Sequence, residues 1–298
     1  MDVHLVDGTY ELFRQFFGQR ERSRVGPDGE EIGAVAGVVA SVVTMLGEGA
    51  THLAVATDHR IESFRNEMWA GYKTSEGVAP ELLAQFPILE ASLTSLGVMV
   101  LAMDELEADD GLASAAAIAA RSPEVDRVFI WTPDKDLAQC VSGERVVQVD
   151  RRAGRVIDEA AVVEKYGVEP SSIPDWLGLV GDSADGFPGL KGWGKQSAAT
   201  VLRRYRHIED IPLDPAVWDP EVLRKVRSAP ALAERLREDG DLAQLFKSLA
   251  TLRIDERLFA DVDDLSWSGP RPGFEETADR LLSGGLVPRV AAVAGRRR

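Results

Sequence analysis

Residues 127–136 read Arg-Val-Phe-Ile-Trp-Thr-Pro-Asp-Lys-Asp, an apolar run followed directly by two aspartates, Asp134 and Asp136. An apolar run of this length that ends at a proline is typical of a buried β-strand. The run belongs to a series, because the segments before it alternate between strand-like and helical hydrophobic patterns. This alternation predicts an α/β fold with a mostly parallel sheet and helices on both faces.

The alternation extends through about the first 165 residues of the chain. We expect five strands, at 3–6, 52–57, 98–102, 127–132 and 145–149. We expect helices around them, at 11–17, 32–46, 80–96, 107–120 and 158–166. After residue 170 only helical patterns remain, interrupted by glycine-containing segments. The chain is therefore divided into an α/β domain at 1–170, a helical domain at 171–255 and a C-terminal tail at 256–298.

The composition of the chain restricts its class. Its 298 residues are 45% hydrophobic and 28% charged, as in an ordinary globular protein. The single cysteine, Cys140, excludes a disulfide framework and a cysteine-based zinc cluster. No signal sequence or membrane-spanning run is evident, so we expect a cytoplasmic protein without a membrane contact. The formal net charge is −15, so binding to nucleic acid would require bases concentrated on one face.

Acidic residues follow four of the predicted strands, at the edge where open α/β sheets bind ligands. They are Asp7, Asp58, Glu107, Asp109, Asp110, Asp134 and Asp136. Each alone is better explained as a turn or helix-cap residue. Together they need compensating cations, because two carboxylates 4 Å apart repel by about 4 kcal/mol at an effective dielectric constant of about 20. Ligand sets made only of oxygen favour Mg²⁺ or Mn²⁺, and such ions commonly serve in phosphoryl transfer.

The helical half carries a second acidic pair and a glycine-rich hairpin. Asp182 and Asp185 are three residues apart, which places them on one face if the segment is helical. The hairpin at 189–195 contains three glycines, whose backbone N–H groups can approach a phosphate closely. Between Leu190 and Arg206 there are five bases and no acid. This stretch is the local basic patch that nucleic-acid binding would require; the alternative is a solvated helix face beside an ordinary turn.

Five motifs, in the same order, resemble those of the 5′-nuclease family. This family comprises flap endonucleases and 5′–3′ exonucleases and includes the nuclease domain of bacterial DNA polymerase I. The motifs are residues 5–8 (LVDG), 63–67 with 72–73 (SFRNE and YK), 107–110 (EADD), 132–137 (TPDKDL) and 181–185 (GDSAD) with the hairpin that follows. The resemblance covers about residues 3–206, and its specificity comes from the combination, since no single motif would suffice.

The resemblance implies a PIN-like α/β domain with a helical arch at about 61–96, followed by a helix-hairpin-helix (H3TH-type) DNA-binding domain. It implies hydrolysis of DNA phosphodiesters at 5′ flaps or 5′ ends in replication and repair, with two Mg²⁺ ions for which Mn²⁺ substitutes. A monovalent cation, K⁺, is implied at the hairpin. The expected substrate is DNA with a 5′ flap, nick or free 5′ end. We expect a monomer that acts alone or with a DNA polymerase in trans.

Residue roles follow from the same resemblance. The implied metal ligands, direct or through water, are Asp7, Asp58, Glu107, Asp109, Asp110, Asp134, Asp136, Asp182 and Asp185. The implied catalytic contacts to phosphate are Lys73 and Arg65. The implied DNA-binding residues are Gly189, Lys191, Gly192, Gly194, Lys195, Gln196, Ser197 and Arg14.

The sequence departs from the family pattern at three places. Glu76 stands where a basic residue is usual, Gly186 stands where asparagine is usual, and Gln196-Ser197 replaces a Lys-Thr pair. All nine acidic positions are kept, so the departures bear on substrate preference and on the strength of the phosphate contacts.

Three other functions are weighed against this interpretation. A haloacid-dehalogenase-type phosphatase would need a nucleophilic aspartate two residues before Asp7, where the chain has Leu5. A PIN-type ribonuclease would share the acidic residues but would not need the hairpin and its basic patch. A catalytically weak, structure-specific DNA-binding protein is favoured only by Glu76 and Gly186, because no expected metal ligand is lost.

Overall fold

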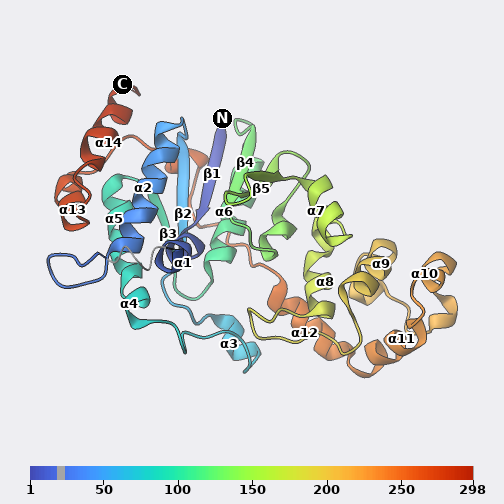
Figure 1. Ribbon diagram of the computed structural model, residues 1–298. Helices are drawn as coiled ribbons and strands as arrows, with labels where there is room; N and C mark the ends of the chain where they lie inside the picture. The colour runs from blue at the N-terminus through green and yellow to red at the C-terminus, as the bar shows by residue number, and fades with distance from the viewer. Residues whose placement is uncertain (19–23, 298) are drawn as a thin grey trace. The chain divides into compact units, whose positions relative to one another are not determined.

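The structure is a computed structural model that describes residues 1–18 and 24–297 (Figure 1). Its residues form two compact units. The first unit comprises Met1–Ile61, Ser75–Thr132 and Ile254–Arg298, and the second comprises Glu62–Thr74 and Pro133–Arg253. The first unit is the predicted α/β fold with a parallel sheet, and the second is mainly helical.

Four parallel strands form the sheet of the first unit, in the order β3-β2-β1-β4. They are β1 (Asp2–Asp7), β2 (His52–Asp58), β3 (Met99–Met103) and β4 (Arg127–Trp131). The register pairs Asp7 with Ala56, and Asp58 with Met103. The parallel pairing brings Asp7 and Asp58 to the carboxyl edge of the sheet, as the sequence predicted. The expected strands agree with the observed ones to within about one residue at each end.

Helices cover both faces of this sheet. They are α1 (Gly8–Gly18), α2 (Gly33–Gly47), α4 (Pro80–Leu83), α5 (Gln85–Leu96), α6 (Ala108–Arg121), α13 (Phe274–Arg280) and α14 (Leu286–Gly295). Figure 1 shows α2 and α5 beside the strands, with α13 and α14 outside them. Helix α2 contains no charged residue, and its buried side chains belong to one hydrophobic cluster with Val6 and Val55 of the sheet and Val290 of α14.

The C-terminal segment is helical and packs into the first unit. The indole N–H of Trp267 donates a hydrogen bond to the carbonyl of Leu96 at 2.8 Å. The Arg297 guanidinium donates to the carbonyls of Leu46 and Ala50 at 2.9 and 2.5 Å, and it lies 4.8 Å from the centre of the Trp267 ring. In the part of the chain that the structure describes, no helix is long and apolar enough to cross a membrane.

The second unit contains one antiparallel strand pair and several helices. The pair is β5 (Val146–Asp150) with β6 (Arg155–Ile157), of which the sequence predicted only the first. The helices are α3 (Phe64–Met68), α7 (Glu159–Tyr166), α8 (Ile173–Val180), α9 (Lys195–Tyr205), α10 (Pro220–Lys225), α11 (Ala229–Glu238) and α12 (Gly240–Ala250). Close packing of α8 on α12 requires Gly178, since a Cβ there would lie 2.8 Å from the backbone nitrogen of Lys247.

An ionic network centred on the buried Asp175 joins α8 to α12 in this unit. Asp175 is fully buried, and its carboxylate accepts from the Ile208 backbone N–H at 2.8 Å. Its two oxygens also lie 2.8 Å from Lys247 Nζ and 3.0 Å from His207 Nδ1. Lys247 extends the network to Glu209, at 2.8 Å. Lys247 of α12 is thus paired with two carboxylates, Asp175 of α8 and Glu209. These ion pairs link the two helices.

The contribution of this network to the stability of the fold changes with pH in the acid range, because the Glu209 carboxyl titrates there. Partial burial alone would raise the pKa of Glu209, but hydrogen bonds, chiefly from Lys247, lower it from 4.5 to about 2. Since the pKa is lower in the folded state, the stabilising contribution is present above pH 4.5 and is lost as the pH falls towards 2. We therefore expect the free energy of unfolding in urea to fall less for Glu209→Gln than for the wild type as the pH is lowered from 4.5 towards 2.

The matched control for this experiment is Glu164→Gln, at an exposed glutamate of α7. This control should follow the wild-type pH profile. If the Glu209→Gln profile were also parallel to the wild-type profile, the ionic link to Lys247 would not contribute to folding.

Candidate functional site

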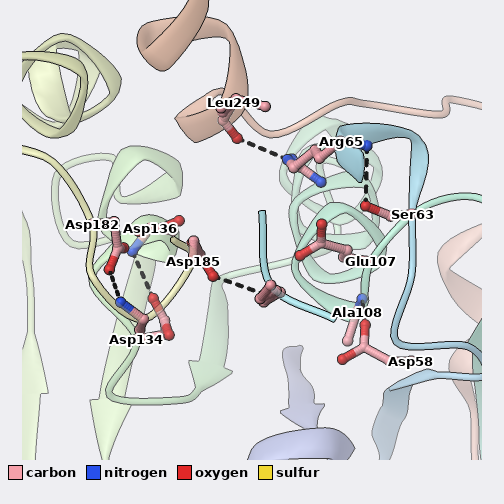
Figure 2. Close-up of polar contacts among 12 residues, drawn as sticks. Asp58, Ser63, Arg65, Glu107, Ala108, Asp134, Asp136, Asp182, Asp185 and Leu249 are labelled. Carbon is pink, nitrogen blue, oxygen red and sulfur yellow. Dashed lines mark hydrogen bonds and ion pairs between the residues drawn. The ribbon is translucent and has the colours of Figure 1, made fainter. Parts of the chain in front are cut away.

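Two acidic residues lie at the carboxyl edge of the first unit's sheet. Asp7 ends β1 and is 5% exposed; one of its oxygens accepts from the Tyr10 backbone N–H at 2.8 Å and the other from Thr132 Oγ1 at 2.9 Å. Asp58 ends β2 and accepts from the Ala108 N–H at 2.6 Å, as Figure 2 shows. Each carboxylate is therefore held in position by hydrogen bonds within the unit.

Three more acids stand at the start of α6. The backbone N–H of Glu107, the N-cap residue, donates to Asp110 Oδ2 at 3.0 Å. Glu107 and Asp110 are buried, and Asp109 is half-buried. Through Ala108, this helix start is hydrogen-bonded to Asp58. The structure thus joins the predicted acids of β2 and α6, while Asp110 also serves the helix as a cap.

A separate group of acids lies in the second unit. Asp136, Asp182 and Asp185 each place one carboxylate oxygen within 4.8 Å of the other two. The exposed Asp134 is linked to this group, because its Oδ1 accepts from the Asp136 backbone N–H at 2.9 Å (Figure 2). We refer to these four residues as the aspartate cluster.

The loop that carries Asp182 and Asp185 is not helical, so the condition for one shared helix face is not met. Helix α8 ends at Val180, and Gly181 follows with a φ of +86°, outside the helical region. The backbones of Asp182 and Phe187 then exchange two hydrogen bonds, at 2.8 and 3.0 Å. This closed loop, rather than a helix, brings the two carboxylates together.

Gly186 completes the same loop in close contact with the segment around Gly71. Its φ is +83°, and a Cβ at this position would lie 2.0 Å from the Gly71 carbonyl oxygen. The Gly186 carbonyl accepts from the Trp69 indole N–H at 3.1 Å. The Lys73 backbone N–H donates to the Asp185 carbonyl at 3.0 Å. A glycine is thus required at 186 by this packing.

The electrostatics of the aspartate cluster favour a bound cation. Asp136 is buried, and its Oδ1 has no hydrogen-bond partner among the residues that the structure describes. Burial, and then the charges of Asp134, Asp185 and Asp182, raise the pKa of Asp136 well above its usual range, while Lys135 opposes this rise. An unpartnered buried oxygen beside other carboxylates is a donor set that fits a hard divalent cation.

Two lysines contact the cluster. Lys73 Nζ lies 3.1 Å from Asp185 Oδ1, and Lys135 Nζ lies 2.5 Å from Asp182 Oδ2. A role was expected for Lys73 from the sequence, but none for Lys135. The available signal was its place between two expected metal ligands, Asp134 and Asp136.

Arg65 is placed differently from a substrate-facing residue. It is 1% exposed, and its guanidinium donates to the carbonyls of Leu249 at 2.7 Å and Thr251 at 3.2 Å. Figure 2 shows it directed at Leu249, at the end of α12. Arg65 therefore ties α3 to α12 within the second unit.

The hairpin residues expected to bind DNA lie at the start of α9. Lys191, Gly192, Gly194, Lys195 and Gln196 are exposed. The Ser197 hydroxyl accepts from the Gly194 backbone N–H at 3.1 Å, which caps the helix.

Two of the expected DNA-binding residues are in internal contacts. Gly189, with a φ of +68°, is packed so closely on α8 that a Cβ would lie 2.3 Å from the Gly181 nitrogen. Arg14 of α1, in the first unit, pairs with the buried Glu11 at 2.6 Å.

Comparison with known proteins identifies the family. Residues 2–167 match the profile of the 5′–3′ exonuclease N-terminal resolvase-like domain, and residues 168–273 match that of the 5′–3′ exonuclease C-terminal SAM fold. A 5′–3′ exonuclease of Aquifex aeolicus is 33% identical over 211 residues, which are 70% of this chain and 71% of that protein. The chain therefore belongs to the 5′–3′ exonuclease family.

Two further similarities extend this result. DNA polymerase I of Pseudomonas aeruginosa is 32% identical over 272 residues, which are 88% of this chain but only 28% of the length of the polymerase. The solved structure of a bacteriophage T5 flap endonuclease, in a complex with DNA and metal ions, superimposes with a TM-score of 0.64 at 16% identity and covers 98% of each chain. At this identity, the second similarity establishes the shared fold.

Proposed function

We propose that this protein hydrolyses DNA phosphodiesters at 5′ flaps or 5′ ends, with Mg²⁺ ions held by its carboxylates. The observation that carries the proposal is the aspartate cluster, in which three residues have carboxylate oxygens in mutual reach. In addition, Asp136 Oδ1 is buried and has no hydrogen-bond partner among the residues that the structure describes. Family membership gives the cluster its reaction class. Mg²⁺ and Mn²⁺ are the ions that all-oxygen sites of this kind suit.

The proposed roles divide the acids by position. Asp136, Asp182 and Asp185 would bind one ion directly, with Asp134 beside them. Asp7, Asp58, Glu107, Asp109 and Asp110 are proposed as the further ligands supplied by the first unit. When bound, such ions activate water and stabilise the negative charge that develops on the phosphate.

The hairpin is proposed to hold the duplex backbone of the substrate. The exposed Lys191 and Lys195, with the N–H groups at the start of α9, supply positive charge for phosphates. A K⁺ ion at the hairpin, action as a monomer, and a DNA polymerase supplied in trans are parts of the same proposal.

A cleavage assay on a 5′-labelled flap duplex tests the proposed function. We expect Mg²⁺-dependent release of a short 5′ product, and no product in EDTA. A matched substrate with an RNA flap tests the alternative of a PIN-type ribonuclease, which would cleave RNA in preference. Tight binding to the junction without cleavage in Mg²⁺ or Mn²⁺ would instead favour a DNA-binding protein that has lost its activity.

Lys73 is expected to contribute more to the rate than to the binding of DNA. Its ammonium group lies against Asp185, where a cation can stabilise charge that develops during cleavage. We expect Lys73→Ala to lower the single-turnover rate about a hundredfold and to change the Kd for DNA little. Lys165→Ala, at an exposed lysine of α7, is the matched control. An unchanged rate would remove Lys73 from the catalytic residues.

The hairpin lysines are expected to determine the salt dependence of duplex binding. Each phosphate contact contributes roughly 0.9 to the slope of log K against log salt concentration. The double substitution Lys191→Ala with Lys195→Ala should therefore lower the slope by about 1.8, as measured by fluorescence anisotropy at several salt concentrations. An unchanged slope would place the duplex elsewhere on the protein.

A further inference from the structure

The Lys135 ammonium group lies against Asp182, on the side of the carboxylate where a bound metal ion would be expected. Its Nζ lies 2.5 Å from Asp182 Oδ2, and the Asp182 side chain is only 3% exposed. At this distance the ammonium group is ion-paired with the buried carboxylate, and it neutralises part of the aspartate cluster.

At this position the Lys135 ammonium group would repel a divalent cation bound by the aspartate cluster. Asp182 is one of the three residues whose carboxylate oxygens lie in mutual reach. A divalent ion bound by these oxygens would lie a few ångströms from the ammonium group, and like charges at such distances repel strongly in a partly buried site. Lys135 and the metal ion therefore compete for Asp182.

An open cavity offers the lysine a second position. Lys135 lines a space of about 580 Å³ together with Asp182, Ser183, Gly186 and Lys195. The Lys135 side chain is 32% exposed, and its four-carbon stem allows the ammonium group to turn. Two ammonium groups on the wall of one cavity form a suitable place for a phosphate.

We propose that Lys135 is an exchangeable counter-ion of the aspartate cluster. It neutralises Asp182 in the metal-free protein, leaves when a divalent cation binds, and then contacts a phosphate of the DNA in the adjoining cavity. This inference rests on the proposed function, since it requires both a metal ion and DNA at this place. Its consequence is that one phosphate contact forms only after the metal has bound.

The first test measures Ca²⁺ binding by calorimetry, with Ca²⁺ as a hard cation that prefers oxygen ligands. Because Lys135→Met removes the competing charge, it should bind Ca²⁺ about tenfold more tightly than the wild type. Lys135→Arg keeps the charge and should remain near the wild type, as should Lys225→Met at an exposed lysine of α10. Thermal melting in EDTA checks that each variant is folded. Equal affinity of the wild type and Lys135→Met would overturn the proposal.

The second test measures the salt dependence of binding to a flap duplex, with gels to confirm that the DNA remains intact. With Ca²⁺, Lys135→Met should show a slope smaller than that of the wild type by about 0.9, because one phosphate contact is lost. In EDTA the two slopes should agree, since the lysine is then paired with Asp182. The same difference in both conditions, or none in either, would overturn the exchange.

The two tests separate this inference from the proposed function. If the wild type bound no Ca²⁺ at all, both would fail, because neither is possible without a metal at the cluster. If the wild type bound Ca²⁺ with an affinity that Lys135→Met left unchanged, only the role of Lys135 would fail. The metal site and the proposed hydrolysis would then stand.

Discussion

Asp136→Asn is expected to abolish cleavage while DNA binding is kept. Asp136 carries an oxygen that is buried and has no hydrogen-bond partner in the described part of the chain, and an amide in its place is a poor ligand for a divalent cation. We expect the single-turnover rate on a flap duplex to fall by at least about a thousandfold, which corresponds to about 4 kcal/mol. The Kd for DNA should stay the same or fall, because a negative charge near the phosphates has been removed.

Thermal melting gives this prediction a second readout. Without metal, Asp136→Asn should melt no lower than the wild type, because repulsion within the cluster has been reduced. The wild type should gain stability when Mg²⁺ is added, and the variant should gain less. Asp241→Asn, at an exposed aspartate of α12, is the matched control and should behave as the wild type in each assay. A parallel loss of cleavage and DNA binding would instead indicate that Asp136 is a structural residue.

Arg65→Ala is expected to have the largest effect on stability. The guanidinium is buried, and its loss leaves the carbonyls of Leu249 and Thr251 without these donors at the end of α12. Leu249 is buried whereas Thr251 is exposed, and an unsatisfied buried acceptor costs about 1–3 kcal/mol, so we expect the free energy of unfolding to fall by about 2 kcal/mol. Urea unfolding of the full chain measures this change, and Arg224→Ala, at an exposed arginine of α10, is the control.

Arg65 was expected from the family resemblance to touch a substrate phosphate, and the same variant can distinguish the two roles. A residue that only positions α3 and α12 should affect stability with little change in the salt dependence of DNA binding. A loss of about 0.9 in the salt slope, with stability near that of the wild type, would restore Arg65 as a phosphate contact. We propose the positioning role, because the side chain is 1% exposed.

The sheet and its acidic edge could be predicted from sequence because both depend on local patterns. Buried parallel strands are short continuous apolar runs, and parallel strands bring their carboxyl ends to one edge. The observed ends of β1 and β2 follow directly from these rules, and Asp7 and Asp58 stand there as expected. The conformation of the loop at 182–187 could not be predicted, because it depends on tertiary contacts with the segment around Gly71.

Other features could not be predicted because burial and pairing depend on residues far apart in the chain. Nothing in the motif at 63–67 indicates that Arg65 is directed at the end of α12, more than 180 residues later. Lys135 was overlooked for a similar reason, since its partner Asp182 comes from another segment. The helices of the C-terminal segment were also missed, because its glycines and prolines resemble those of an irregular tail.

The contact between Gly186 and Gly71 restricts how the loop can be exchanged among relatives. Asparagine, which the family resemblance leads us to expect at 186, would place its Cβ where the Gly71 carbonyl oxygen lies. Restoring the family residue alone should therefore distort the loop rather than improve it. A chimaera that transfers residues 69–73 and 181–187 together from one relative would preserve the match between the two backbones. The two segments thus form a single exchangeable module, although more than 100 residues separate them in the sequence.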